Sequence, residues 1–105
     1  MAALGCALAA AAAFGGVASA DTTTPQPECT FTNAPGKVYS ATVRGASPST
    51  GSSSVNGRWY FDDVPATANT FVAIGSNNTV TRNSGATKIA FKASGGGKVY
   101  CVSSR

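Results

Sequence analysis

The chain has 105 residues, of which 43% are hydrophobic and 11% are charged, and it contains no histidine. The missing histidine excludes Ser-His-Asp and Cys-His catalytic arrangements and the commonest metal ligand. Eight Lys and Arg against four Asp and Glu give a formal net charge of +4. All four acids precede Val64, so the C-terminal third is purely basic. We interpret this charge as solubilising, with steering toward phosphates, acidic polysaccharides or anionic surfaces as the alternative.

The N-terminus has the pattern of a secretory signal peptide. Residues 2–17 are apolar or small, and Ala18-Ser19-Ala20 resembles a cleavage site, although no Lys or Arg precedes the apolar run. A membrane anchor is the alternative, but the run is shorter than the roughly 20 residues that cross a bilayer. We expect a secreted, extracellular protein with a signal peptide over 1–20, a polar leader over 21–27 and one domain over 28–105, with no membrane span after cleavage.

Two cysteines, Cys29 and Cys101, remain after such cleavage. An even number of cysteines in an exported chain predicts a disulfide. The bridge would close a loop of about 70 residues and stabilise the domain by about 4 kcal/mol on the chain-entropy model. Free or intermolecular thiols are the alternative.

Short alternating segments separated by turn residues follow the leader. The first strand is expected to begin at Glu28 and to end before a turn at residues 33–36. The second covers residues 37–44, and its core face is expected to be formed by Tyr39, Ala41 and Val43. Residues 45–54 are rich in Ser and Gly, which predicts a flexible loop.

The segment from Val55 to Ile74 is the densest apolar and aromatic stretch after the N-terminus. Asn56-Gly57 is a turn dipeptide, and the alternating residues that follow predict a strand that ends at Val64-Pro65. Residues 70–74 predict another strand. We expect this segment to be the central hairpin, with Trp59 in the core and Tyr60 on the opposite face.

The remaining third continues the same pattern. A short strand is expected over 79–82, between turns at 75–78 and 83–85. Residues 87–93 alternate cleanly, with Lys88 and Lys92 facing outward, and a glycine turn leads to a last strand over 98–102. About six or seven short strands without any helical period predict an all-β fold, a small antiparallel β-sandwich stapled by one disulfide.

The only adjacent carboxylates are Asp62 and Asp63. Neighbours on a strand point to opposite faces, so this pair cannot flank one glycosidic bond, and a turn is the simpler role. A calcium site there lacks further carboxylates nearby, and paired cysteines argue against a thiolate nucleophile or a cysteine zinc site. We predict no enzyme, no catalytic residue, no metal site and no cofactor.

Five side chains are candidate contacts for a ligand or partner. An exposed aromatic beside a cation suits sugar rings, nucleobases or protein surfaces, although no specific nucleic-acid motif is present. The candidates are Arg58, Trp59, Tyr60, Lys88 and Lys92. Asn77-Asn78-Thr79 is an N-glycosylation sequon in a predicted turn, so Asn77 is a candidate glycan site if the source is a eukaryote.

Two resemblances accompany this pattern. Gly57-Arg58-Trp59-Tyr60-Phe61 with Val64-Pro65 and the later Thr70-Phe71-Val72-Ala73 resembles the motif of carboxypeptidase-regulatory-like, transthyretin-type sandwiches, but it has about two extra residues after the proline and lacks the usual Gly there. The overall layout resembles small secreted effector-like β-sandwich proteins of plant-associated fungi, except that Cys101 lies later than their second cysteine. The first resemblance implies a sandwich, and the second implies a host-interacting binder.

We therefore expect a secreted, non-enzymatic, effector-like binding protein that acts on an extracellular or host partner. We expect it to be a monomer. A cell-wall or polysaccharide-binding module that uses Tyr60, Trp59 or the Lys88 and Lys92 face is the first alternative. A structural surface protein is the second. The partner, protein or glycan, is not identified by any motif in the sequence.

Overall fold

The computed structural model describes residues 24–105. The expected signal peptide and the first residues of the leader lie outside this range. Within it, the chain forms eight strands in two antiparallel sheets, which confirms the predicted all-β sandwich. The strands are β1 (Glu28–Thr32), β2 (Val38–Ser47), β3 (Ser54–Phe61), β4 (Val64–Pro65), β5 (Thr70–Ala73), β6 (Asn77–Ala86), β7 (Lys88–Ala93) and β8 (Lys98–Ser104). No helix in residues 24–105 is long and apolar enough to cross a membrane.

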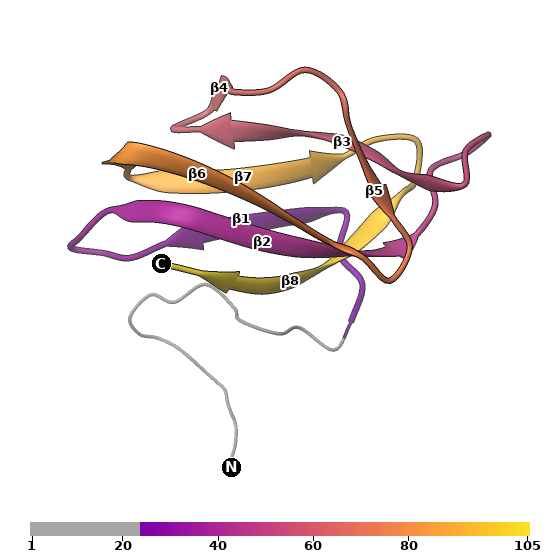
Figure 1. The fold of residues 1–105 in the computed structure, drawn as a ribbon, viewed down its shortest axis with the longest axis horizontal. Coiled ribbons are helices and arrows are strands. Elements are labelled where there is room, and N and C mark those ends of the chain that lie inside the picture. Colours follow the sequence, from indigo (N-terminus) through magenta and orange to yellow (C-terminus); the bar gives the residue numbers. More distant parts are fainter. Residues whose placement is uncertain (1–23) are drawn as a thin grey trace, which may run out of the picture.

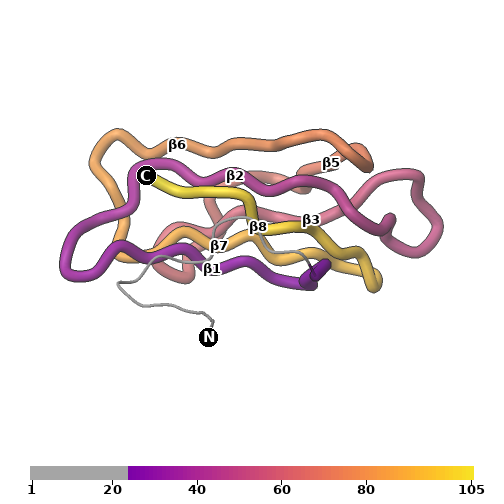
Figure 2. The backbone as a smooth tube through the Cα atoms, turned by 90° about the horizontal axis from the view of Figure 1, so that it is seen from below, coloured from indigo at the N-terminus to yellow at the C-terminus, as the bar shows by residue number. Residues whose placement is uncertain are grey.

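The two sheets lie face to face. Sheet A has the order β1-β7-β3-β4. Strand β4 pairs with the C-terminal end of β3, and β5 pairs with the N-terminal half of β3. Sheet B has the order β6-β2-β8. In Figure 1 the sheets overlie one another, and Figure 2 shows them edge-on, with β2 and β6 on one side and β1 and β7 on the other. This arrangement leaves one outer face on each sheet.

The core fills the space between the sheets. Strand alternation turns every second side chain inward, and the four largest fully buried side chains, Trp59, Phe31, Phe91 and Ile89, come from sheet A. The Trp59 and Phe91 rings meet edge to face with their centroids 5.1 Å apart. Trp59 Nε1 donates to Asn78 Oδ1 at 2.9 Å, so the indole N–H is satisfied inside the protein. The buried side chains of sheet B are Val38, Ala41, Val43, Ala86, Val99 and Cys101.

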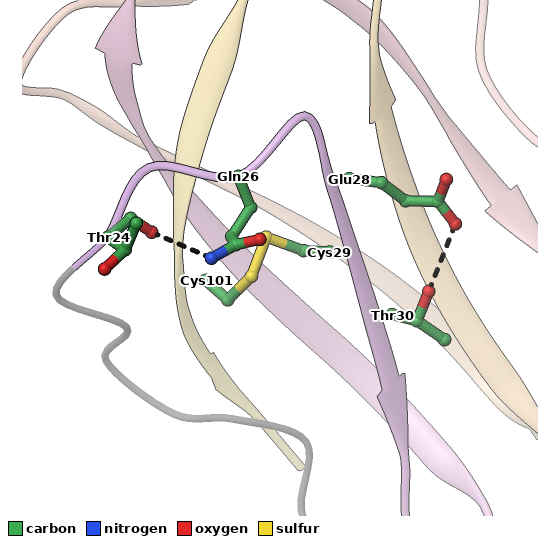
Figure 3. Close-up of a disulfide and its surroundings, with 6 residues drawn as sticks. All are labelled: Thr24, Gln26, Glu28, Cys29, Thr30 and Cys101. Carbon is green, nitrogen blue, oxygen red and sulfur yellow. Dashed lines mark hydrogen bonds between the residues drawn. A yellow bond between two sulfur atoms is a disulfide. The ribbon is translucent and has the colours of Figure 1, made fainter.

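The predicted disulfide joins the two sheets. Cys29 on β1 and Cys101 on β8 are bonded, with their Cα atoms 5.6 Å apart, as Figure 3 shows. Just before β1, Gln26 exchanges backbone hydrogen bonds with Val99 of β8. The end of the expected polar leader therefore forms an isolated bridge with β8. The disulfide and this pairing close one side of the sandwich.

The expected turn at Asn56-Gly57 is wrong. Both residues lie inside β3, where Gly57 is opposite Ala93 and Thr70. A Cβ atom on Gly57 would lie 2.5 Å from Phe91 Cζ and 2.6 Å from the Lys92 carbonyl oxygen. The glycine is needed because the Phe91 ring packs directly on the backbone of β3. Close packing, not a turn, accounts for this residue.

The predicted core face of β2 is correct for Ala41 and Val43 but wrong at its start. Val38 is fully buried, whereas Tyr39 is 47% exposed. The pairing of β2 with β6 shifts register between Val38 and Ser40. Such an irregularity changes the phase of the alternation, so Val38 and Ala41 both face the core although they are three residues apart.

Two segments are more ordered than expected. Strand β2 continues to Ser47, and the buried Ser49 side chain donates to the Ser94 carbonyl at 2.6 Å and accepts from the Asn56 N–H at 2.9 Å. The loop over 45–54 is thus anchored to two other segments. Strand β6 also runs through the turns that were expected around residues 77 and 84.

Candidate binding surfaces

Four of the five predicted contact residues lie on one surface, the outer face of sheet A. Arg58 is directly opposite Lys92 on the neighbouring strand, and Tyr60 is opposite Ala90. Lys88 lies two residues before Ala90 and therefore points to the same side. We call the surface formed by Arg58, Tyr60, Lys88 and Lys92 the aromatic face. The sequence alternation alone was enough to predict that these side chains point outward.

Tyr60 is the centre of the aromatic face. Lys92 Nζ lies 4.8 Å from the centroid of the Tyr60 ring, a cation–π contact. Ala90 points outward between them and is still only 5% exposed, so the larger side chains cover it. The Tyr60 ring and the Lys92 ammonium group therefore lie next to one another on the outer face of sheet A.

The aromatic face is extended by Phe71, which sequence reasoning did not select. Phe71 of β5 is opposite Asn56 of β3, and Asn56 and Arg58 share one side of that strand. The Phe71 side chain is 63% exposed. At the other end of β3, Pro65 of β4 is opposite Tyr60. Aromatic and arginine side chains of this kind are enriched at the centres of protein interfaces.

Charges on sheet A are balanced. Its three cations, Arg58, Lys88 and Lys92, are matched by three acids, Glu28, Asp62 and Asp63. Lys88 Nζ lies 3.1 Å from Asp63 Oδ1, whereas no described residue forms an ion pair with Arg58. Arg58 therefore keeps its guanidinium available for a partner.

Trp59 is not a contact residue. It is 1% exposed and its ring packs on Phe91 in the core. A partner on the aromatic face cannot reach it, because the β3 backbone separates the two sides of the strand. Trp59 therefore lies in the core, as one prediction had it, and its place among the candidate contacts was wrong.

Asp62 and Asp63 form the turn between β3 and β4, as expected. Both have positive φ, 50° and 68°, which suits a two-residue hairpin turn. The Asp62 N–H donates to the Lys88 carbonyl, and the Lys88 N–H donates to Asp62 Oδ1, both at 3.0 Å. Within residues 24–105, no three His, Cys, Asp or Glu side chains are grouped so that they could hold a metal ion.

A shallow pocket of about 360 Å³ lies where β3, β4 and the loop after β4 approach β6. Arg82 on β6 lies with its guanidinium carbon 5.3 Å from the centroid of the Phe61 ring, and its Nη1 is 3.7 Å from Asp62 Oδ2. Val64 at the rim is 63% exposed. The lining is mostly apolar and its one cation is matched by one carboxylate, so the pocket suits a small apolar side chain.

The outer face of sheet B carries a second group of side chains that sequence reasoning missed. Arg44 in the central strand is directly opposite both Asn77 and Tyr100. Lys98 lies two residues before Tyr100 and points to the same side. We call the surface formed by Arg44, Asn77, Lys98 and Tyr100 the basic face. Only the pairing of β2 with β6 and β8, three segments distant in the sequence, brings these residues together.

Asn77, the candidate glycan site, is exposed at the first residue of β6. It lies in a strand, not in the turn that was expected. Its Oδ1 accepts a hydrogen bond from Arg44 Nε at 2.9 Å, so its Nδ2 is not used in that contact. Glycosylation of Asn77 stays a prediction, and a glycan there would lie on the basic face.

The fold and these surfaces define a disulfide-bonded β-sandwich with two outer faces of different chemistry. Comparison of the chain with protein-family models, with curated proteins and with solved structures found no match. Functional inference therefore depends on the side chains described above.

Proposed function

We propose that the chain is a secreted, non-enzymatic binding protein of the effector-like kind, which contacts an extracellular or host protein through the aromatic face. The observation that carries the proposal is the grouping of Tyr60, Arg58 and the exposed Phe71 on one side of sheet A. Tyr and Arg are enriched among the few residues that dominate the binding energy of protein interfaces, and Phe is enriched in the interfaces themselves. The balanced charges around them suit a protein partner with both signs on its surface.

Other features support secretion and the absence of catalysis. The pattern of residues 1–20 and the Cys29–Cys101 bond are typical of exported proteins. The chain has no histidine, and Asp62 and Asp63 are held in a turn beside Lys88. The shallow pocket at Phe61 and Val64 adjoins the same edge of sheet A and could receive an apolar side chain of the partner.

The test is quantitative capture by the exported, tagged protein from the extracellular fluid of colonised host tissue. Tyr60→Ala and Arg58→Ala should each reduce retention of the captured host protein by about tenfold or more, the effect of losing an interface hot spot. Tyr100→Ala is the matched control, because it removes a tyrosine from the other face, and it should retain the partner.

Expression of the gene gives an independent readout, since this function requires induction during colonisation. Constitutive transcripts together with no captured protein would contradict the proposal and favour a structural surface protein. Capture that both sheet A variants leave unchanged would show that the aromatic face is not the contact surface.

A further inference from the structure

Charge is distributed unequally between the two sheets. In the described part of the chain every acidic side chain belongs to β1 or to the β3–β4 turn of sheet A, and the strands of sheet B carry none. The cations of β2, β6 and β8 are Arg44, Arg82 and Lys98, and Lys37 and Arg105 flank these strands. Arg82 is turned toward Phe61 and Asp62, whereas Arg44 and Lys98 are exposed. The basic face is thus cationic without any opposing carboxylate on its own strands.

The Arg44 side chain is anchored through one of its nitrogens. It lies in the middle strand of sheet B, and its Nε donates to Asn77 Oδ1 at 2.9 Å. Within residues 24–105 its two Nη groups have no hydrogen-bond acceptor and no ion-pair partner. A guanidinium fixed through Nε presents the remaining N–H groups as a planar fork, which matches the two oxygens of a carboxylate or sulfate. Asn77 acts here as a positioning residue.

The surroundings of Arg44 match a carbohydrate. Tyr100 is directly opposite Arg44 and is partly exposed, and a tyrosine ring can stack on a sugar. Thr42 and Thr79, the next outward pair along these strands, share a hydrogen bond of 2.7 Å between their hydroxyl oxygens. Hydroxyl and amide side chains are suitable partners for sugar hydroxyls. Tyr39 is the only residue of sheet B among the exposed large hydrophobic side chains of residues 24–105, so an apolar surface for insertion into lipid is lacking.

We propose that the basic face binds an anionic polysaccharide, with Arg44 as the principal contact and Lys98 and Tyr100 beside it. Carboxylated and sulfated polysaccharides present the same oxyanion chemistry to Arg44, so both belong to the proposal. This site is separate from the aromatic face, because the two faces lie on opposite sides of the sandwich. The chain could therefore hold a protein partner and a polysaccharide together.

The test measures dissociation constants of the exported protein for polygalacturonate and for heparin at low salt. The protein is produced in a bacterial periplasm, so that Asn77 carries no glycan. Arg44→Gln should weaken binding to at least one of the two polysaccharides by about tenfold or more, as expected for loss of a charge-assisted hydrogen-bonding group. The matched control is Arg58→Gln on the aromatic face, which should change the constant less than about twofold.

A salt titration sharpens the assignment, because each lost cation lowers the dependence of log K on log salt concentration. Arg44→Gln and Lys98→Gln should both reduce this slope, and Arg58→Gln should not. Unchanged thermal unfolding of each variant shows that the surface substitutions preserve the fold. Equal weakening by Arg58→Gln, or no binding to either polysaccharide, would overturn the proposal. Tighter binding to a single-stranded oligonucleotide, or to phosphatidylserine-containing phosphatidylcholine vesicles, would overturn it as well.

Discussion

Sheet A contributes the tryptophan and both phenylalanines of the buried core, whereas sheet B contributes only valine, alanine and cysteine side chains to it. The outer faces of the two sheets differ in the signs of their charges. Sheet A carries cations and acids together, and sheet B carries cations alone. Burial of large apolar side chains dominates stability, and exposed charges contribute little. Substitutions should therefore affect folding mainly through the inner face of sheet A and binding through either outer face.

The charges of the chain are grouped differently in the fold than along the sequence. Along the sequence the C-terminal third is purely basic, which indicates one basic region. In the fold, β7 lies between β1 and β3, so Lys88 and Lys92 join the acids of sheet A. Arg44 from the N-terminal half lies with Lys98 on sheet B. Strand pairing, and not position in the chain, decides which charges share a surface.

The largest difference between the sheets should follow from truncating their buried side chains. Trp59→Ala should lower the free energy of unfolding by about 3–5 kcal/mol, because it removes the largest fully buried side chain. Val43→Ala, its counterpart in sheet B, should cost about 2 kcal/mol. Urea unfolding measures both costs. It is followed by circular dichroism, because Trp59 is the only tryptophan and its fluorescence is lost in the Trp59→Ala variant. If Trp59→Ala does not fold, Trp59→Phe serves instead. An equal cost at the two positions would contradict the comparison.

Removing the disulfide between the two sheets should lower the free energy of unfolding by a similar amount. Replacing both Cys29 and Cys101 by alanine opens a loop with a sequence separation of 72 residues and should lower stability by about 4 kcal/mol. Reduction of the wild-type protein should produce a similar shift of the urea midpoint, and the double variant should not respond to reductant. A wild-type midpoint that is the same before and after reduction would show that the bond does not stabilise the sandwich.

A smaller effect is expected where β3 and β7 approach most closely. Gly57→Ala should lower stability by about 1–3 kcal/mol, because the added Cβ meets the Phe91 ring and the backbone of Lys92. Thermal unfolding measures the change. Wild-type stability in this variant would mean that the inner face of sheet A has room for an extra methyl group, contrary to its close packing.

The smallest effect on stability is expected for the exposed ion pair between Asp62 and Arg82. Asp62→Asn removes the ion pair with Arg82 but keeps an acceptor for the Lys88 N–H and tolerates the positive φ of 50°. It should cost less than about 1 kcal/mol. Asp62→Ala loses the acceptor too and should cost more in the same thermal unfolding experiment. Equal costs for the two variants would show that the charge, not the turn, is what matters.

Local pattern predicted much of the fold. The alternation of β7 correctly places Ile89 and Phe91 inside and Lys88 and Lys92 outside, and the cysteine count correctly predicts the disulfide. Gly57 was misinterpreted because its contact with Phe91 is tertiary and leaves no local trace. The outward Tyr39 depends on a register shift with β6. The basic face depends on which strands pair, which periodicity does not report.

The difference between the two outer faces can be tested directly by mapping amide chemical shifts of the exported, isotope-labelled protein during titration with polygalacturonate or heparin. Perturbations are predicted at Arg44, Asn77 and Tyr100 on the basic face, with Arg58 and Tyr60 unchanged. Perturbations centred on Arg58 and Tyr60, or spread equally over both sheets, would contradict the assignment of different chemistry to the two faces.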